Sequence, residues 1–335
     1  DPLVTFGYMP GSQGTPGVKK IWSVNQSFSF PLKYIIQKKL SRNYLILAEY
    51  EFSQAKLATL LDAKLTFYEL IYRRKLLDLL EKRASGYNRL KSAWKLMLDN
   101  GEATILDYNK IMMELSSLEL EIARVKADII QITEKLQYLN GGSDFIPEAL
   151  EYEVPVEKDI EELIAEKSVV HPEFLIPEAE YLISLEEVRL SRAGSLPEIQ
   201  LAYSSEIMPG ETFTGPAGGI TLPLWANSNR VKRATAFSKH AEAGKEAALM
   251  RLESEVRSEY AVMLALKKSI AELSRILRET GDTKNYDIAL ENGEINILNY
   301  FSYLDVIFST EERLLQTEFE YQKILTKLSD HQLLK

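Results

Sequence analysis

Apolar residues recur at every third or fourth position through residues 34–98, a stretch with no proline and a single glycine, Gly86. This spacing places the apolar side chains on one face of a helix. The face is marked by Leu65, Tyr68, Tyr72, Leu76 and Leu79. A helix of about 65 residues is roughly 100 Å long. We therefore predict one helix that is too long to pack inside an ordinary globular domain.

Asn100 and Gly101 are expected to end this helix, because both residue types tolerate the left-handed backbone that closes a helix. A returning helix is predicted over about residues 104–138. The second half of the chain repeats this plan. Its predicted elements are a helix over about 227–291, a turn at Asn292 and Gly293, a helix over about 297–328 and an earlier helix over about 172–193.

The two halves are also related in sequence. Ser-Phe-Pro-Leu at residues 29–32 recurs as Thr-Leu-Pro-Leu at 221–224, and Asn-Gly-Glu at 100–102 recurs at 292–294. Both pairs have the same offset of 192 residues (221 − 29 and 292 − 100). A repeat of this length indicates a duplicated domain-sized unit rather than a solenoid. The first copy lacks the helix that precedes the second, so we expect a missing segment before Asp1.

Four short segments alternate between apolar and polar residues with a period of two, which predicts strands with one apolar and one polar face. They form two predicted hairpins, in residues 1–31 and 195–225. The residues expected on the apolar, lipid-facing side are Trp22, Val24, Phe28, Phe30, Ile199, Leu201, Tyr203, Ile220 and Leu222. Those expected on the opposite, lumen-facing side are Ser23, Asn25, Ser27, Ser29, Gln200, Ser204 and Glu206.

Such alternation has two interpretations. A half-buried sheet packed on helices shows it, and so does a transmembrane barrel. The barrel is favoured by a polar face of small uncharged residues and by aromatic residues near strand ends, such as Tyr8, Trp22 and Trp225. Four strands are too few to close a barrel, so this interpretation requires several chains.

Composition narrows the function classes. The net charge is −9, which argues against a nucleic-acid partner. With no cysteine, the chain has no disulfide, thiolate metal site or thiol nucleophile. The sequence contains no run of 18 or more apolar residues, so no transmembrane helix is predicted.

No catalytic, cofactor or metal site is expected. His171, His240 and His331 lack the spacing of a zinc site and are expected to be solvated or to cap helices. Met112, Met113 and Met208 are expected to fill helical or strand positions rather than bind a soft metal. The glycine-rich residues 215–219 lie between predicted strands, so they are expected to form an external loop rather than a phosphate-binding loop.

The repeated unit of hairpin, very long helix, glycine turn and returning helix resembles the TolC-like outer-membrane efflux proteins over essentially the whole chain. The residues that carry the resemblance are Asp-Pro-Leu-Val-Thr-Phe-Gly at 1–7, Ser-Leu-Pro-Glu-Ile at 195–199, the proline-centred strand ends at 30–32 and 222–224, and the two Asn-Gly-Glu tips. The opening Asp-Pro and the tips are most similar to the metal-efflux branch that includes CusC and CzcC.

The resemblance implies a mostly α protein with a small β part. In such a homotrimer, each protomer gives four strands to a 12-stranded outer-membrane barrel and four helical columns to a periplasmic helical barrel. It also implies a Gram-negative outer membrane, a periplasmic adaptor, an inner-membrane pump and a passive role in export. The expected domains are hairpins at 1–31 and 195–225, long helical hairpins at 32–140 and 226–335, a linker at 141–171 and a short helix at 172–194.

In such proteins the helical turns close the periplasmic entrance and open by untwisting. The corresponding tip residues here are Asn100, Gly101, Asp107, Asn292, Gly293, Asn299 and Ser302. Asp107 matches an acidic position that lines the entrance, whereas Asn299 and Ser302 are uncharged, so a second acidic ring is in doubt. A type I protein-secretion duct and a soluble coiled-coil scaffold with a small β cap stay open as alternatives.

Overall fold

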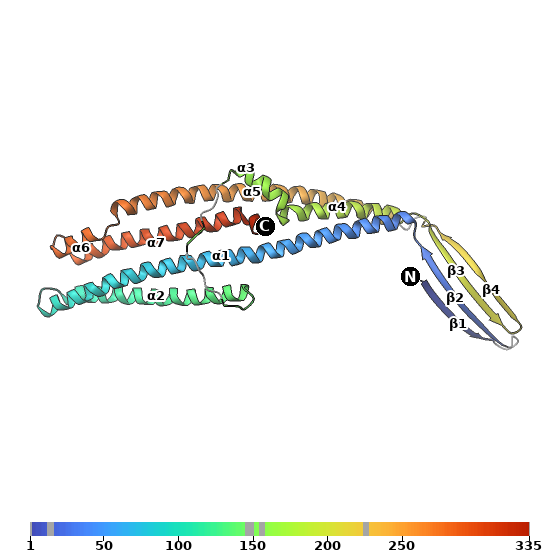
Figure 1. The fold of residues 1–335 in the computed structure, drawn as a ribbon, viewed down its shortest axis with the longest axis horizontal. Helices are drawn as coiled ribbons and strands as arrows, with labels where there is room; N and C mark the ends of the chain where they lie inside the picture. Colours follow the sequence, from blue (N-terminus) through green and yellow to red (C-terminus); the bar gives the residue numbers. More distant parts are fainter. Residues whose placement is uncertain (1, 12–16, 145–150, 154–157, 224–227, 335) are drawn as a thin grey trace. The chain divides into compact units, whose positions relative to one another are not determined.

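The computed structural model describes residues 2–11, 17–144, 151–153, 158–223 and 228–334 (Figure 1). This part of the chain is mostly helical, with one small sheet. Its elements in chain order are β1 (Pro2–Pro10), β2 (Val18–Phe28), α1 (Pro31–Asp99), α2 (Ile105–Leu139), α3 (Ile160–Val170), α4 (Pro172–Ala193), β3 (Glu198–Met208), β4 (Glu211–Thr221), α5 (Ser228–Thr280), α6 (Lys284–Glu291), α7 (Ile297–Leu328) and the 3₁₀ helix η1 (Asp330–Leu334). The predicted fold class, mostly helical with two strand hairpins and two long helical hairpins, is confirmed.

The four strands form one antiparallel sheet in the order β1-β2-β3-β4 (Figure 1). Val4 lies opposite Val24, Val24 opposite Tyr203, and Tyr203 opposite Pro216. Directly opposed residues of antiparallel strands project from the same face. The register therefore joins the alternation of the separate strands into one sheet with two distinct faces.

Three predicted strand residues lie just beyond the strands. β2 ends at Phe28, so Ser29 and Phe30 fall between it and α1, which begins at Pro31. Proline suits the first position of a helix because that N–H has no helical acceptor, and it cannot donate to a strand ladder. Leu222 likewise follows the end of β4 and precedes a proline. Leu224 and Trp225 lie outside the described residues.

The loop predicted at residues 215–219 is wrong, because these residues lie inside β4. The β3–β4 turn is instead at Pro209 and Gly210, where Gly210 has a φ of +89°. A turn with proline as its first central residue and a positive φ at its second favours glycine there, because glycine adopts this φ without steric cost. Pro216 is tolerated because β4 is an edge strand of this sheet. The run of small residues concealed the strand alternation in the sequence.

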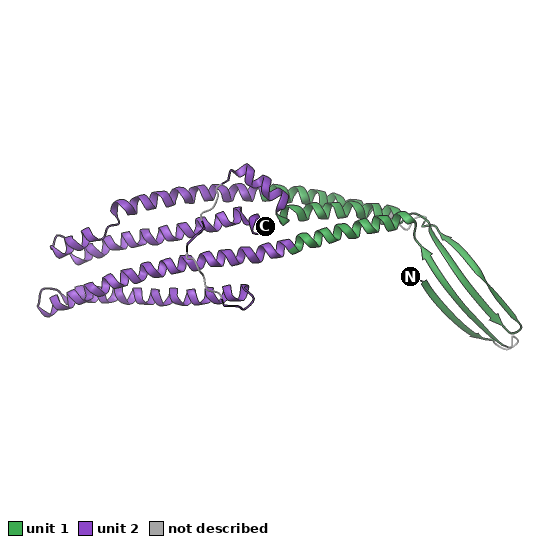
Figure 2. Ribbon diagram, viewed as in Figure 1, with its two compact units in different colours: residues 1–52, 171–252 green, residues 53–170, 253–335 purple. Residues whose placement is uncertain are grey.

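The chain divides into two compact units (Figure 2). Unit 1 contains Asp1–Phe52 and His171–Leu252, and unit 2 contains Ser53–Val170 and Glu253–Lys335. Unit 1 holds the sheet, α4 and the first parts of α1 and α5. In it, α4 is joined to α1 by the ion pair between Lys39 Nζ and Glu186 Oε1 (2.6 Å), and to α5 by the Ser184–Ser238 hydroxyl contact (3.2 Å).

Unit 2 holds three apolar clusters that fix the neighbours of each helix. The largest joins α1, α2 and α7 and contains Leu80, Tyr87, Ile111 and Phe301 among its buried members. A second joins α3, α5 and α7 through Ile164, Val256, Met263, Leu325 and Leu328, and a third joins Leu70 of α1 to Ile132 and Leu136 of α2. Within unit 2 the long helices therefore follow one another in the order α5, α7, α1, α2 (Figure 2).

The helix predicted over 227–291 is interrupted. α5 ends at Thr280 and α6 begins at Lys284. The Asp282 carboxylate accepts the Lys284 N–H (3.1 Å) and so competes with continuous helix. α1 has no such break and runs for 69 residues. No helix in the described part carries an apolar stretch long enough to span a membrane.

The predicted linker 141–171 contains an unpredicted helix, α3. Lys167 anchors α3 to the C-terminal end of the chain, through Asp330 Oδ1 (2.9 Å) and the Lys327 carbonyl (2.8 Å). His331 Nε2 lies 3.1 Å from Glu166 Oε2 and adds a second link. These contacts join segments about 160 residues apart, which local sequence patterns do not reveal.

Candidate functional site: the two-faced sheet and the helical tips

One face of the sheet is mainly apolar and open, although Lys20, Gln26 and Ser205 also lie on it. Seven residues that were predicted to face lipid project from this face: Trp22, Val24, Phe28, Ile199, Leu201, Tyr203 and Ile220. They are joined there by the β1 residues Val4, Phe6 and Tyr8, and Phe6 is 80% exposed. Most of these large side chains are exposed within this chain. Because an apolar surface of this size is costly in water, it indicates contact with lipid or another protein.

The opposite face carries a polar network. Thr5 Oγ1 and Ser23 Oγ are 2.7 Å apart, and Asn25 Nδ2 donates to Ser23 Oγ (2.9 Å). Gln200 Nε2 donates to Thr221 Oγ1 (3.2 Å). Lys19 Nζ lies 2.8 Å from Glu206 Oε2. With Ser27 and Ser204, the predicted lumen-facing strand residues thus share one face. Leu3, Ile21 and Phe213 project from it as well, so this face is mixed rather than uniformly polar.

Ser29 lies beyond the end of β2, but its side chain still binds a residue on the polar face. Its hydroxyl donates to Glu198 Oε1 (3.1 Å) at the start of β3. Lys33, in the first turn of α1, donates to both Ser29 Oγ (3.1 Å) and Glu198 Oε1 (3.2 Å). Ser29 therefore helps join the sheet to α1 within unit 1.

The two helical tips have the same hydrogen bonds. Gly101 and Gly293 have φ values of +77° and +72°, which favour glycine. Gly101 N donates to Leu98 O (3.0 Å), and Gly293 N donates to Leu290 O (3.0 Å). The following glutamates donate from their N–H groups to the carbonyls of Met97 and Ala289, both at 2.8 Å. The predicted Asn-Gly turns are confirmed, and each bond recurs at the offset of 192.

The tips differ in the cap of the returning helix. Asp107 forms a capping box with Thr104, in which the Asp107 N–H donates to Thr104 Oγ1 (3.2 Å) and the Thr104 N–H donates to Asp107 Oδ2 (3.3 Å). The Thr104 hydroxyl also donates to Asp107 Oδ2 (2.6 Å). In the second copy the Asn299 N–H donates to Asn296 Oδ1 (2.8 Å). Asn299 and Ser302 have exposed side chains. The Asp107 carboxylate thus has a structural partner in addition to the entrance role predicted for it.

Above the tips, a charged pair joins the two helical hairpins. Arg83 of α1 binds the carboxylate of Asp305 on α7 and lies over the Phe308 ring (4.8 Å to its centroid). Next to it, the Tyr87 and Phe301 rings meet edge to face, with centroids 5.1 Å apart. Tyr300 Oη donates to Asp287 Oδ1 (2.6 Å), and burial with this bond raises the pKa of Tyr300. Sequence reasoning missed the Arg83–Asp305 pair because its partners are 222 residues apart.

A groove of about 660 Å³ lies between the two hairpins beside the tips. It is lined by α1 residues such as Trp94, by the tip residues Glu102 and Asp107, and by Asp287 and Tyr300 of the second hairpin. The groove therefore brings the tips of both copies to one surface.

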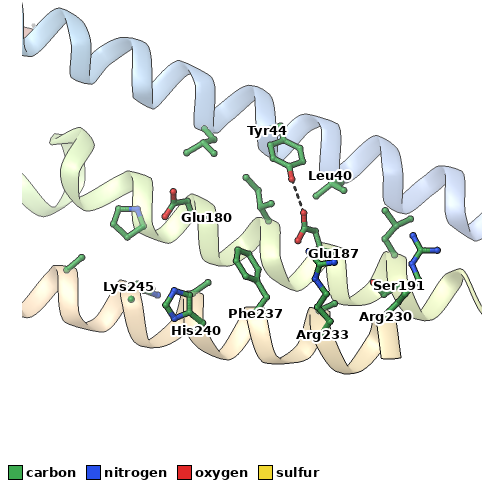
Figure 3. Close-up of a pocket in the computed structure, with 18 residues that line it drawn as sticks. Leu40, Tyr44, Glu180, Glu187, Ser191, Arg230, Arg233, Phe237, His240 and Lys245 are labelled. Carbon is green, nitrogen blue, oxygen red and sulfur yellow. Dashed lines mark hydrogen bonds between the residues drawn. The ribbon is translucent and has the colours of Figure 1, made fainter. Parts of the chain in front are cut away.

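A second groove, of about 820 Å³, lies in unit 1 among α1, α4 and α5 (Figure 3). Tyr44 Oη donates to Glu187 Oε1 (2.9 Å) at its edge. Arg230, Arg233 and Lys245 of α5 bring positive charge, and Phe237 lies between the helices (Figure 3). The groove thus combines positively charged side chains with apolar surface.

The three histidines have different environments. His171 caps α4 through Nδ1, which accepts the Glu173 N–H (3.3 Å), and His240 is exposed, as predicted. The prediction is wrong for His331, which is buried beside Glu166. Burial lowers the pKa of His331, and the bond with Glu166 opposes this shift only in part. Within the described ranges, no three metal-ligating side chains gather into a group.

The chain was compared with known protein families, curated sequences and solved structures. No protein-family model and no curated protein sequence matches the chain. Solved structures match almost all of it. CusC, a protein that forms a transmembrane channel, has a TM-score of 0.81 at 15% identity, over 98% of this chain and 82% of CusC. The outer-membrane protein VceC of Vibrio cholerae has a TM-score of 0.81 at 15% identity, over 100% of this chain and 86% of VceC. The outer-membrane channel MtrE of Neisseria gonorrhoeae, solved in its open state, has a TM-score of 0.80 at 16% identity, over 99% and 80%.

The chain has the outer-membrane channel fold. The resemblance expected from the tips and proline-centred strand ends is thereby confirmed for the fold. CusC and VceC match this chain equally well, so the likeness does not single out a metal-efflux branch.

Proposed function

We propose that this chain is the subunit of an outer-membrane exit duct in a Gram-negative bacterium. The observation that carries the proposal is the four-stranded sheet, whose apolar face is exposed and whose opposite face holds a polar network. A barrel of this kind presents an apolar surface to lipid and a polar surface to its lumen. The backbone of a membrane-embedded sheet has no unpaired edge.

The two edge strands, β1 and β4, indicate how several copies of the chain assemble. Within the described residues each pairs on one side only. Four strands cannot close a barrel, so several copies must pair β4 of one chain with β1 of the next. Three copies give 3 × 4 = 12 strands, the number implied by the family resemblance. The functional unit is therefore a homotrimer in contact with outer-membrane lipid.

The helices extend this duct into the periplasm. The tips meet a periplasmic adaptor and an inner-membrane pump that supplies the energy, so the chain is a passive conduit and not an enzyme. Its cargo is small, such as drugs or metal ions. The Gly101 and Gly293 tips form the closed entrance, and the Arg83–Asp305 pair holds the two hairpins together.

The proposal is tested with the full-length protein extracted from outer membranes in detergent. We expect native mass spectrometry to give a trimer, and the purified trimer to conduct ions across planar lipid bilayers. A chain that leaves the membrane with high salt and remains monomeric would instead be a peripheral scaffold. A trimer whose deletion stops secretion of one protein, without increasing sensitivity to small toxic solutes, would identify a secretion duct.

A further inference from the structure

The groove in unit 1 has the size of a site for a small organic molecule. Its volume of about 820 Å³ lies within the range of about 300–1,000 Å³ that is usual for ligand pockets. α4 lies between α1 and α5, and all three helices line the groove (Figure 3). The side chains on these helices therefore decide which class of molecule fits.

One end of the groove is positively charged. Arg230 and Arg233 line it in the first turns of α5, and both side chains are exposed. Residues 229–241 contain four Lys or Arg residues and no Asp or Glu, although the chain as a whole has a net charge of −9. Among the described residues, neither arginine lies within ion-pair distance of a carboxylate, whereas Lys245 is paired with Glu178. Two such guanidinium groups favour an anionic ligand, because each can bind carboxylate, sulfonate or phosphate oxygens in a bidentate manner.

The middle of the groove is apolar. Phe237 lies between the helices and is 53% exposed, so part of its ring is open to a ligand (Figure 3). Leu40 of α1 and Ile183 of α4 also line the groove. An exposed aromatic ring beside aliphatic side chains offers a surface on which an apolar or aromatic body packs. The ligand that matches both parts is amphipathic.

Two carboxylates also line the groove. The Glu187 carboxylate accepts the Tyr44 hydroxyl (2.9 Å), and Glu180 lies at the end of the groove away from Arg230 (Figure 3). Three basic and two acidic lining side chains leave a net charge of +1 (3 − 2, with His240 neutral). The groove therefore favours a ligand with one negative group at the arginine end over a cation.

The groove opens on the side of the polar face of the sheet. Lys33, Leu40 and Leu47 of α1 are seven residues apart, so they share one face of the helix. Leu40 and Leu47 line the groove, and Lys33 donates to Glu198 Oε1 (3.2 Å) on the polar face. In the proposed duct this face lines the lumen. Three copies would then place 3 × 2 = 6 arginines around the path of the cargo.

We propose that the groove is a binding site in the wall of the duct for amphipathic organic anions. The ligand has one carboxylate, sulfonate or phosphate group, held by Arg230 and Arg233, and an aromatic or alicyclic body, packed on Phe237. This inference rests on the proposed exit duct and narrows the class of its cargo. Binding is weak, because a molecule in transit must leave the site as well as enter it.

Binding to the full-length trimer tests the site. The trimer is placed in nanodiscs of phosphatidylcholine, which has no net charge, and titrated calorimetrically with cinnamate and with its neutral isostere cinnamamide. We expect cinnamate to bind, and Arg230→Gln and Arg233→Gln each to weaken its affinity about tenfold, as for the loss of a charge-assisted hydrogen bond. Lys232→Gln is the matched control, since Lys232 is exposed on the same helix but does not line the groove.

Three results would overturn the site. These are equal affinities for cinnamate and cinnamamide, an unchanged cinnamate affinity of the Arg230→Gln/Arg233→Gln trimer, and an equal loss of affinity in Lys232→Gln. If the double variant keeps its cinnamate affinity but loses anionic phospholipid that copurifies with the wild type, the arginines bind lipid headgroups instead. Each result is obtained with trimers that conduct ions, so it leaves the proposed duct intact.

Single-channel recording tests whether the groove faces the lumen. Cinnamate should reduce the conductance of the wild-type channel and of Lys232→Gln, and have no effect on the Arg230→Gln/Arg233→Gln channel. Cinnamamide should leave all three unchanged. Calorimetric binding of cinnamate without any effect on wild-type conductance would place the groove outside the path of the cargo and overturn the proposal.

Discussion

The Asp107 carboxylate is held by Thr104, three residues earlier, at the N-terminus of α2. The Thr104 N–H and Thr104 Oγ1 both donate to Asp107 Oδ2 (3.3 and 2.6 Å), and the Asp107 N–H donates back to Thr104 Oγ1 (3.2 Å). The equivalent Asn299 uses its backbone N–H to bind Asn296 Oδ1 (2.8 Å). The chemical difference between the two tips is therefore also a difference between a reciprocal and a one-way helix cap.

Removing either member of this cap should loosen the first turn of α2. For Thr104→Ala or Asp107→Ala we expect a local cost of ~1 kcal/mol, seen as roughly fivefold faster hydrogen exchange of the amides of residues 105–108. Asn299→Ala is the control, since its side chain contributes no bond to the cap. If Asp107→Ala changes the cation-to-anion permeability ratio while Thr104→Ala does not, the carboxylate acts on ions in the entrance.

Local sequence patterns predicted the elements that depend on local physics. The Asn-Gly tips, the helices over 297–328 and 172–193, and the alternating faces of β2 and β3 follow from turn chemistry and periodicity. Only the end of β4, at Ile220, is predicted from the sequence, because Gly215, Pro216 and Gly218 give no alternation. These residues are in a strand because they pair with β3. The Arg83–Asp305 pair was beyond local patterns, because it depends on the packing of distant helices.

Breaking the Arg83–Asp305 pair should destabilise the closed tips. Asp305→Ala leaves a largely buried guanidinium without this partner, and Arg83 Nε already has none. We expect a cost of ~1 kcal/mol, because half of the Asp305 side chain is exposed to solvent, and a corresponding rise in conductance. Arg83→Met should cost less, because it removes the buried charge itself. It leaves only the half-exposed Asp305 carboxylate without its partner.

The control for this prediction is Asp78→Ala. Asp78 binds Lys82 on the same face of α1 (2.6 Å), and both side chains are exposed. Such a pair contributes ~0.3–0.5 kcal/mol at most, so its loss should leave conductance unchanged. Equal conductance of the Asp305→Ala and wild-type channels would show that the pair does not restrain the tips.

His331 should make the junction of α3 with the C-terminal end sensitive to acid. Its pKa in the folded chain is lowered by burial, so the unfolded chain binds a proton first as the pH falls below about 6.5. The free energy of unfolding should therefore decrease through this window and level off below the folded pKa. The charged groups around it are Glu166, Lys158, Lys167 and Asp330.

Thermal unfolding at several pH values checks this dependence. His331→Gln should flatten the pH dependence between about 5 and 7, whereas His240→Gln, at an exposed position, should leave it unchanged. If the His331→Gln protein keeps the slope of the wild type, another group titrates in this range.

The two faces of the sheet should differ in how well they tolerate an introduced charge. Leu201 projects from the apolar face and is 54% exposed, while the adjacent Gln200 projects from the polar face. Near the middle of a membrane, Leu201→Arg should cost ~2–4 kcal/mol, because the guanidinium would lie in hydrocarbon, with a smaller cost near an interface. Gln200→Arg should be inserted normally, since a water-filled lumen solvates the charge. The fraction of each variant recovered as heat-stable trimer in the outer membrane measures the difference. Equal recovery of both variants would mean that the apolar face is not exposed to lipid, which would favour a sheet covered by another protein.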